Sequence, residues 1–411
     1  MKKAYAIVLV ALSVIVLSWF LPWLYSIVFP VGGSDPFIAY SPVSNQLIVS
    51  TLDEQGTIAS ADNEGNLTGE TFTREQRDSL LPQIYFTQLM ARDEMPDSIN
   101  GMEMSVPALK HNQWVFSSIP HDVNKVFPEV FLIMESMPKR IDLEDPEEVF
   151  RFRDGKVEFI DIATNSVNDS RTRRFTEIFN DRGFTLPVKS FSANITSRKA
   201  YDDGYLMVDG NNDVFHLKMQ AGRPYMVKLR KPDALKAANV FIMENIDNRH
   251  LGFMSDTDNN LYIIEKEGYR IIKLDNVKFN ARKDRVSVVK NLFNFVVKTS
   301  NEKGSQWNVF DSETYAPIAS YSRVETESTS QKVASWIFPF ELSFSSTSDC
   351  YAKPRFEYFS WHALILNVVL AALLFVVLRR RRRNMACCCS CAAVTVVFGI
   401  FAFIPLIIIN K

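Results

Sequence analysis

The sequence predicts a mainly β, β-propeller-like extracytoplasmic domain with a few helical insertions, carried by three transmembrane helices. Long apolar runs occur at the two ends of the chain, and five consecutive arginines separate the last two runs. Between the ends, short segments rich in β-forming residues alternate with turn sequences. We therefore divide the chain into an N-terminal anchor (1–30), an extracytoplasmic domain (31–358) and a C-terminal transmembrane hairpin (359–411).

The composition is that of a globular protein with added membrane segments. The chain has 411 residues, of which 47% are hydrophobic and 31 are phenylalanines. Its 46 Lys and Arg residues nearly balance 47 Asp and Glu residues, which gives a formal net charge of -1. Because no global positive charge is present, the sequence indicates no nucleic-acid partner.

Three apolar runs are long enough to cross the hydrocarbon core, which needs roughly 17 to 25 residues. They are Ala4–Pro30, Trp361–Leu378 and Ala386–Ile409. The first run is about twice as long as the apolar region of a secretory signal, roughly 7 to 15 residues, and no small-residue cleavage site follows it. We therefore interpret it as an uncleaved anchor, with a cleaved signal as the alternative.

Basic residues set the predicted orientation, because they remain on the cytoplasmic side of a membrane. The basic residues concerned are Lys2, Lys3, Arg379, Arg380, Arg381, Arg382 and Arg383. The N-terminus and the loop between the last two spans are thus expected inside, and the main domain outside. A third span would then leave Asn410 and Lys411 outside. Anionic membrane lipids are the expected partner of the arginines, in preference to an acidic protein surface.

The extracytoplasmic domain is predicted to consist of antiparallel meanders. About six turn-and-strand signals recur at intervals of roughly 40 to 57 residues, whereas propeller repeats run about 40 to 50. The clearest has strands at Tyr205–Val208, Val214–Met219 and Tyr225–Leu229, with turns between them. A large sandwich or a two-domain β protein would give similar local signals, but the sequence favours the propeller.

Helices are expected at three places in this domain. The first begins at Thr73 and restarts at Pro82. The second covers Arg173–Asn180, with Gly183 just beyond its end, and a shorter one is predicted at Pro232–Ala238.

Catalytic and cofactor-binding motifs are not recognisable in the sequence, so we predict no catalytic residues and no cofactor. The five histidines are scattered, and no phosphate-binding glycine loop or Gly-x-Ser-x-Gly motif occurs. The weak metal candidate is a calcium loop at Asp256, Asp258 and Asn260, whose oxygen ligands alternate. Leu261 replaces the glycine that such a loop needs, which favours an ordinary hairpin turn.

Four cysteines lie close together in the last apolar run: Cys387, Cys388, Cys389 and Cys391. A metal or acylation site is one interpretation. Consecutive residues on a helix point about 100° apart, so these thiols do not all converge on one ion. We favour their being small membrane residues.

Several strings resemble an uncharacterised family of bacterial membrane proteins associated with ABC-type transporters. They are Val157-Glu-Phe-Ile-Asp-Ile-Ala-Thr-Asn165, Arg174-Phe-Thr176, Tyr201-Asp-Asp-Gly-Tyr205, Phe215-His-Leu-Lys-Met219, Gly222-Arg-Pro-Tyr225, Leu81-Pro82 and Met95-Pro-Asp-Ser-Ile-Asn-Gly101. The resemblance implies a Gram-negative inner membrane, a periplasmic main domain, and a transporter permease or ATPase as partner. It implies no catalytic or binding residue.

These observations predict a non-enzymatic inner-membrane accessory protein of an ABC-type transport system. One alternative is a cell-envelope hydrolase whose site forms only in the fold, which a cleft with two close carboxylates or a histidine-centred cluster would favour. Another is a ligand sensor that signals through its helices.

Overall fold

The computed structural model describes residues 2–30, 35–51, 56–126, 130–138, 141–199, 201–245 and 247–410. The chain forms two compact units: a β unit at residues 35–324, and a helical unit that combines residues 1–34 with 325–411. Residues 325–358, which precede the predicted C-terminal hairpin, cluster with the apolar helices. The predicted boundary at 30/31 adjoins residues 31–34, which lie outside the described residues.

The β unit contains five larger antiparallel sheets, four of which have four strands in sequential order. The first sheet holds β1 (Phe37–Tyr40), β2 (Leu47–Ser50), β3 (Ile58–Ala61) and β4 (Leu67–Thr71). The second holds β8 (Phe131–Leu132), β9 (Glu148–Arg153), β10 (Lys156–Asp161) and β11 (Ser166–Val167). The third holds β12 (Ser190–Ala193), β13 (Tyr205–Val208), β14 (Val214–Gln220) and β15 (Arg223–Lys228). The meander predicted around Tyr205 is confirmed.

The remaining two sheets complete the unit. The fourth holds β16 (Ala237–Ile242), β17 (His250–Asp256), β18 (Asn260–Glu265) and β19 (Ile271–Lys278). The fifth holds β20 (Arg285–Lys290), β21 (Asn294–Asn301), β22 (Gly304–Asp311), β23 (Pro317–Val324) and, at its edge, β7 (Trp114–Ser118). β7 is thus distant in the chain from the other strands of its sheet.

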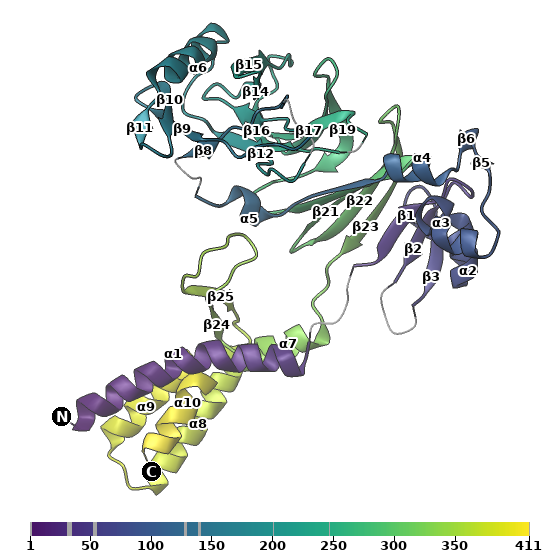
Figure 1. The fold of residues 1–411 in the computed structure, drawn as a ribbon. Coiled ribbons are helices and arrows are strands. Elements are labelled where there is room, and N and C mark those ends of the chain that lie inside the picture. Colours follow the sequence, from purple (N-terminus) through teal and green to yellow (C-terminus); the bar gives the residue numbers. More distant parts are fainter. Residues whose placement is uncertain are drawn as a thin grey trace. The chain divides into compact units, whose positions relative to one another are not determined.

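Apolar cores join these sheets into a series. One core joins the second and third sheets around Phe150 and Phe215, and the next joins the third and fourth around Leu206 and Met254. Further cores join the fourth to the fifth and the fifth back to the first. Among the described residues, none of these cores joins the first sheet to the second, and Figure 1 shows these two sheets at opposite ends of the unit.

Helices of the β unit occupy the connections between strands. They are α2 (Arg74–Leu80), α3 (Pro82–Ala91), α4 (Val106–His111), α5 (Pro120–Val123) and α6 (Asp169–Asp181), and a small ribbon of β5 (Ser98–Ile99) and β6 (Met102–Glu103) follows α3. Thr73 caps α2 in a reciprocal arrangement with Gln76, and Pro82 begins α3, as predicted. The helix predicted at Pro232–Ala238 is wrong, because this segment forms a turn and then enters β16.

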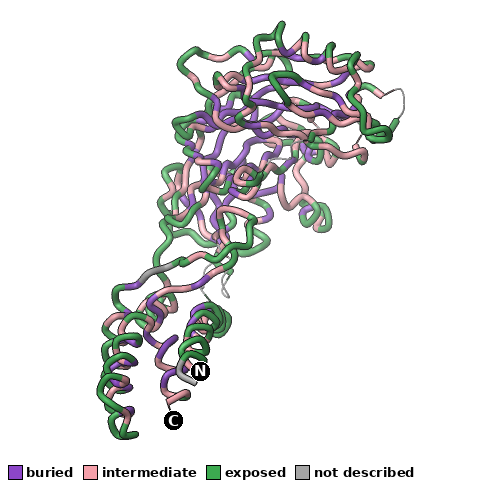
Figure 2. Tube along the Cα trace, turned by 90° about the vertical axis from the view of Figure 1, so that its left-hand side faces the viewer, coloured by how far each residue is buried: buried purple, intermediate pink, exposed green. Residues whose placement is uncertain are grey.

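The helical unit contains α1 (Lys2–Val28), α7 (Thr329–Ile337), α8 (Ala363–Arg380), α9 (Met385–Phe398) and α10 (Ile400–Ile409). A short ribbon of β24 (Phe340–Ser343) and β25 (Arg355–Phe359) lies between α7 and α8. By length and composition, α1 from Ala4 and α8 are the two described helices able to cross a membrane, and only 11% and 28% of the residues in their apolar 18-residue segments are buried. Figure 2 shows the exposed surface that runs along these helices.

The predicted third span is wrong, because the apolar run breaks into α9 and α10 at Gly399. Gly399 has φ 56° and ψ −134°, a conformation that only glycine adopts readily, and a side chain there would collide with Asn367 of α8. The chain reverses at this residue. Asn410, at the end of α10, returns beside Cys391 in the middle of α9, so the two helices form an antiparallel hairpin (Figure 1).

Candidate functional site

A pocket of about 490 Å³ lies where edge strands of four sheets meet in the β unit. Its walls come from β7 and α5, from β8, from β12 with part of β13, and from β16. Strand order explains the position, because β8, β12, β16 and β7 are each an edge strand. Unpaired strand edges tend to pair with other strands. The way in which these edges are covered therefore determines which chemical groups line the pocket.

Two serines cover the backbone of one of these edges. The hydroxyl of Ser192 in β12 accepts a hydrogen bond of 2.9 Å from the backbone N–H of Ile242 in β16. Ser190 accepts one of 3.3 Å from the N–H of Val240. The third and fourth sheets are thus joined through side chains in place of a strand ladder, and a cavity remains between the strands.

The pocket lining is mainly aromatic. Phe116, Phe131, Phe191 and Phe241 line it together with Tyr205. The Tyr205 hydroxyl donates a hydrogen bond to the carbonyl of Leu132, and burial raises the pKa of Tyr205 above its usual value. Such a lining suits an apolar or aromatic group.

A buried hydroxyl gives the pocket one polar feature. Ser118 is 3% exposed and lines the pocket at the end of β7, and its Oγ has no hydrogen-bond partner among the described residues. A buried polar atom without a partner costs free energy, which a bound polar group would recover. A more open depression of about 690 Å³ lies on the other side of Phe131 and Phe191, between Arg151 and Pro187.

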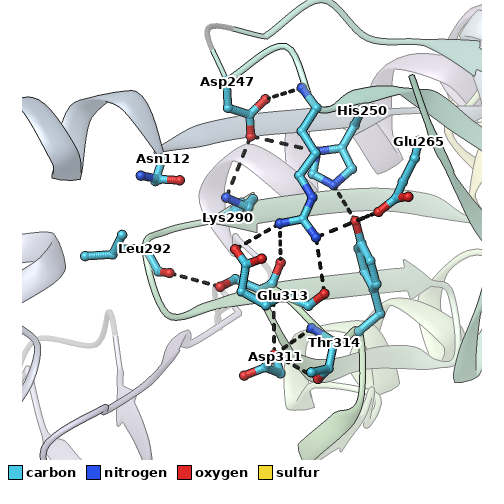
Figure 3. A network of polar contacts seen from close by, with 12 residues as sticks. Asn112, Asp247, His250, Glu265, Lys290, Leu292, Asp311, Glu313 and Thr314 are labelled. Carbon is cyan, nitrogen blue, oxygen red and sulfur yellow. Dashed lines mark hydrogen bonds and ion pairs between the residues drawn. The ribbon is translucent and has the colours of Figure 1, made fainter. Parts of the chain in front are cut away.

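A second cluster, of buried charged groups, lies between the fourth and fifth sheets (Figure 3). At its centre the hydroxyl of Tyr315 donates a hydrogen bond of 2.7 Å to Glu265 and lies 3.0 Å from Nε2 of His250. Because the Tyr315 proton is already donated to Glu265, the imidazole must be the donor at Nε2. Its Nδ1 faces Asp247 at 3.8 Å and has no hydrogen-bond partner among the described residues.

The remaining charges of the cluster are balanced. Asp247 accepts a hydrogen bond of 2.9 Å from the indole of Trp114 and lies 3.7 Å from Lys290. Arg249 lies between Glu313, at 2.9 Å, and Glu265, at 3.7 Å. The cluster therefore pairs acidic and basic groups across the sheet boundary.

Burial controls the protonation of these groups. It lowers the pKa of His250 to about 4, although Asp247 acts in the opposite direction, and it also lowers the pKa of Lys290. For Glu265, burial alone would raise the pKa, but hydrogen bonds from Arg270 and Tyr315 outweigh it and lower the pKa. At neutral pH the imidazole is therefore uncharged.

The preceding pair of sheets repeats the histidine–tyrosine contact. The hydroxyl of Tyr269 lies 2.9 Å from Nδ1 of His216 in the third sheet. Tyr269 and Tyr315 both lie in the hairpin turn before the last strand of their sheet, with φ values of 53° and 61°. Each tyrosine reaches back to a histidine of the preceding sheet. This repetition, together with the 1% exposure of both histidines, assigns the clusters a structural role in joining sheets.

Residues 37–310 match the family described as "Domain of unknown function (DUF4857)". The chain belongs to this family. The matched range begins at β1 and ends in β22, so it covers the pocket and the His216–Tyr269 pair of the DUF4857 chain, whereas Tyr315 of the second pair lies just beyond it. A comparison with curated proteins gives no match.

Solved structures similar to this DUF4857 protein include domains described as β-propellers. One is the β-propeller domain of Cps50 (Swd1) from Myceliophteria thermophila, with 17% identity, coverage of 49% of this chain and 58% of that chain, and a TM-score of 0.26. The Dos1 propeller has 11% identity, coverages of 73% and 66%, and a TM-score of 0.27. The WD40 domain of SCAP from fission yeast has 8% identity, coverages of 78% and 79%, and a TM-score of 0.26.

The chain thus spans less than two thirds of the length of the first two of these structures. Scores this low carry no argument about detailed arrangement. The four-stranded antiparallel sheets of the DUF4857 unit are instead established by their own strand pairing.

The calcium candidate forms a closed hairpin turn. The carboxylate of Asp256 accepts hydrogen bonds from the N–H groups of Asp258 and Asn260, at 2.9 and 2.8 Å, and from the Asn260 amide and the Tyr262 hydroxyl, both at 2.8 Å. Lys278 contacts the side-chain oxygen of Asn260 at 2.8 Å. The Asp256 carboxylate and the Asn260 side-chain oxygen thus already accept hydrogen bonds from protein donors.

The basic residues named for topology lie in the helical unit. Lys2 and Lys3 begin α1, and their side chains lie outside the described residues. Arg379 and Arg380 end α8, Arg381 caps it, and Arg382 and Arg383 follow in the turn before α9. Cys388 and Cys391 are buried in the helix bundle, whereas Cys389 is exposed, so these thiols do not all point to one place.

The sequence analysis missed the pocket and both histidine–tyrosine pairs. The pocket forms from strands that are distant in the chain, and no local spacing marks it. The sequence contains one weak signal for the pairs. Tyr269 follows the turn at Gly268, and Tyr315 follows the turn at Thr314.

Proposed function

We propose that this DUF4857 protein is a membrane-anchored accessory subunit of an ABC-type transport system, with its β unit on the periplasmic side of a bacterial inner membrane. The observation that carries the proposal is the aromatic pocket beside Ser118. Among the described residues, its lining contains one carboxylate, Asp122, and one ammonium, Lys125, with apolar and hydroxyl groups elsewhere. This composition supports binding of an apolar segment of a partner in preference to chemistry on a substrate.

The five sheets would act as blades of an incomplete propeller, and their edge strands would supply the binding face. Propellers use loops and edges for contact while their strands form the core. The histidine-centred cluster gives little support to the hydrolase alternative, because it is packed between sheets and His250 is only 1% exposed.

The proposed topology uses two spans. α1 and α8 cross the membrane, with the N-terminus and the arginine-rich turn in the cytoplasm. The α9–α10 hairpin enters the membrane beside α8 and returns, since its end lies near Arg381. The family resemblance noted from the sequence supports the transporter assignment.

Copurification tests this function. The full chain, solubilised in mild detergent, should recover a transporter permease or ATPase. Replacement of Ala193 by Trp, which would fill the pocket, should abolish recovery. Ala163→Trp, at an exposed turn, is the matched control and should leave recovery unchanged. Absence of such a partner from the wild-type eluate, or its retention by Ala193→Trp, would contradict the proposal.

A further inference from the structure

Large aromatic side chains of the helical unit remain exposed near the end of α1 and the beginning of α8. Trp336 is 48% exposed, Trp361 is 72% exposed and Phe356 is 77% exposed. On α1, Trp19 and Trp23 are 44% and 47% exposed and stack on each other at a ring separation of 6.4 Å. Contiguous exposed apolar surface of this kind marks a surface that something else covers.

The helix α7 connects the ends of the two candidate spans. Near its beginning, the Tyr25 hydroxyl of α1 donates a hydrogen bond of 3.1 Å to the carbonyl of Ser330, and the Ser330 hydroxyl donates one of 2.8 Å to the carbonyl of Phe29. Near its end, the ring of Trp336 lies 5.3 Å from that of His362, immediately before α8. Because α7 is fixed to the end of one span and to the beginning of the other, it lies along the membrane surface at which these spans leave the bilayer.

The side chains of α7 divide into three faces. Ala334 and Ile337 pack against the helix bundle. Val333 and Trp336, which are one turn apart, form an exposed apolar face, and Val333 is 44% exposed. Gln331 belongs to the polar remainder of the helix and is exposed. A polar face beside an apolar one is typical of a helix that lies in a membrane interface.

The ribbon of β24 and β25 continues this surface. Phe340 packs against Phe401 at the beginning of α10, with a ring separation of 5.3 Å. Phe344, just after β24, contacts Trp19 edge-on at 6.4 Å. The ribbon is thus fixed to the bundle, while Phe356, whose ring lies 5.7 Å from that of Phe340, stays exposed.

We propose that α7 and the β24–β25 ribbon form a lipid-binding collar at the outer interface of the bilayer, with Val333 and Trp336 inserted among the lipids. Tryptophan prefers this depth, because its ring is apolar while its N–H still reaches water or headgroups. The exposed apolar surface of α7 and the ribbon continues that of the candidate spans α1 and α8. The group that covers it is therefore lipid. The inference depends on the membrane placement of these spans in the proposed function, and it does not depend on the transporter partner.

Spin-label accessibility in vesicles tests the collar. The full chain, with its five native cysteines replaced by Ala, would carry one label at Val333→Cys and be reconstituted into phosphatidylethanolamine–phosphatidylglycerol vesicles. Accessibility to oxygen, which concentrates in lipid, is compared with accessibility to a water-soluble nickel chelate. We expect a ratio several-fold higher at Val333→Cys than at the matched control Gln331→Cys. Trp336→Cys supplies an independent label on the same face and should agree with Val333→Cys.

Each other outcome overturns the collar. Equal ratios at Val333→Cys and Gln331→Cys would mean that α7 stands in water. Protection of Val333→Cys from both reagents would mean that protein covers it. A label at Val369→Cys, on the exposed face of α8, separates the two proposals. A low oxygen ratio there contradicts the membrane placement itself, whereas a high ratio there with a low ratio on α7 contradicts only the collar.

Discussion

The guanidinium of Arg381, just after α8, donates a hydrogen bond of 2.8 Å to the carbonyl of Ile407, near the end of α10. Arg381 also contacts the carbonyl of Asn410 at 3.3 Å. The end of α10 therefore lies beside the arginine-rich turn. If the arginines remain in the cytoplasm, as the proposed topology requires, Asn410 must remain there too.

Labelling with a membrane-impermeant maleimide checks this topology. In a chain whose four helix cysteines are replaced by Ala, Asn410→Cys should react only after the inner membrane is opened. The native Cys350, which is exposed, should react in intact spheroplasts and serves as the control for the outer side. Reaction of Asn410→Cys in intact spheroplasts would place residue 410 outside the inner membrane. That result would contradict the two-span topology and would require a third span.

Replacement of Gly399 by Ala should destabilise the hairpin. Its φ of 56° strains any residue with a side chain, and the new methyl group would lie 2.1 Å from Oδ1 of Asn367. We expect a loss of roughly 1–3 kcal/mol from the strained backbone, with the collision adding to it. Thermal unfolding in detergent measures the loss. Gly69→Ala has φ 86° and open space around it, so it should cost less; equal losses would argue against the contact with Asn367.

Tyr315→Phe should destabilise the boundary between the fourth and fifth sheets. It removes the hydroxyl that serves both His250 and Glu265, and buried groups left without partners cost about 1–3 kcal/mol each. The midpoint of thermal unfolding should fall clearly, whereas Tyr5→Phe, on the exposed side of α1, should leave it unchanged. An unchanged midpoint for Tyr315→Phe would show that the cluster does not contribute to the stability of the fold.

The stability of the β unit should decrease as the pH falls below neutrality. Burial lowers the pKa of both His216 and His250 from 6.5 to about 4. Between these values the unfolded chain binds more protons than the folded chain, so each histidine's contribution is complete above pH 6.5 and is lost as the pH falls toward 4. The loss is at most on the order of 3 kcal/mol for each histidine.

Thermal unfolding between pH 7 and pH 4.5 tests this linkage. His216→Gln should flatten the dependence on pH, because one of the two titrating groups is gone. The exposed His111→Gln should keep the wild-type slope. An identical slope in wild type and His216→Gln would show that other groups control the acid response.

Local features of the fold could be predicted from the sequence. The capping residue Thr73, the restart at Pro82 and the hairpins from Tyr205 to Lys228 follow from turn chemistry and alternation, which act over a few residues. The alternating pattern also gave the antiparallel meanders. These signals depend little on the rest of the molecule.

Features decided by distant contacts could not be predicted. A glycine within an apolar run is compatible with a continuous span, and only the contact between Gly399 and Asn367 reveals the reversal. The five histidines gave no useful spacing, because His216 and His250 meet tyrosines of another sheet. The pocket likewise depends on Ser192 lying against the edge of β16, a relationship that turn patterns do not encode.

The strand β7 has a consequence for how the protein is made. Its five residues pair with β20, so that Ser118 lies opposite Val286, and three complete sheets are synthesised between them. During synthesis from the N-terminus, β7 must therefore remain unpaired until β20 has been made. Pairing over such sequence distances is slow and leaves strand edges open to aggregation. Translation products that end before Arg285 should consequently need chaperones or be degraded, even though several of their sheets are complete.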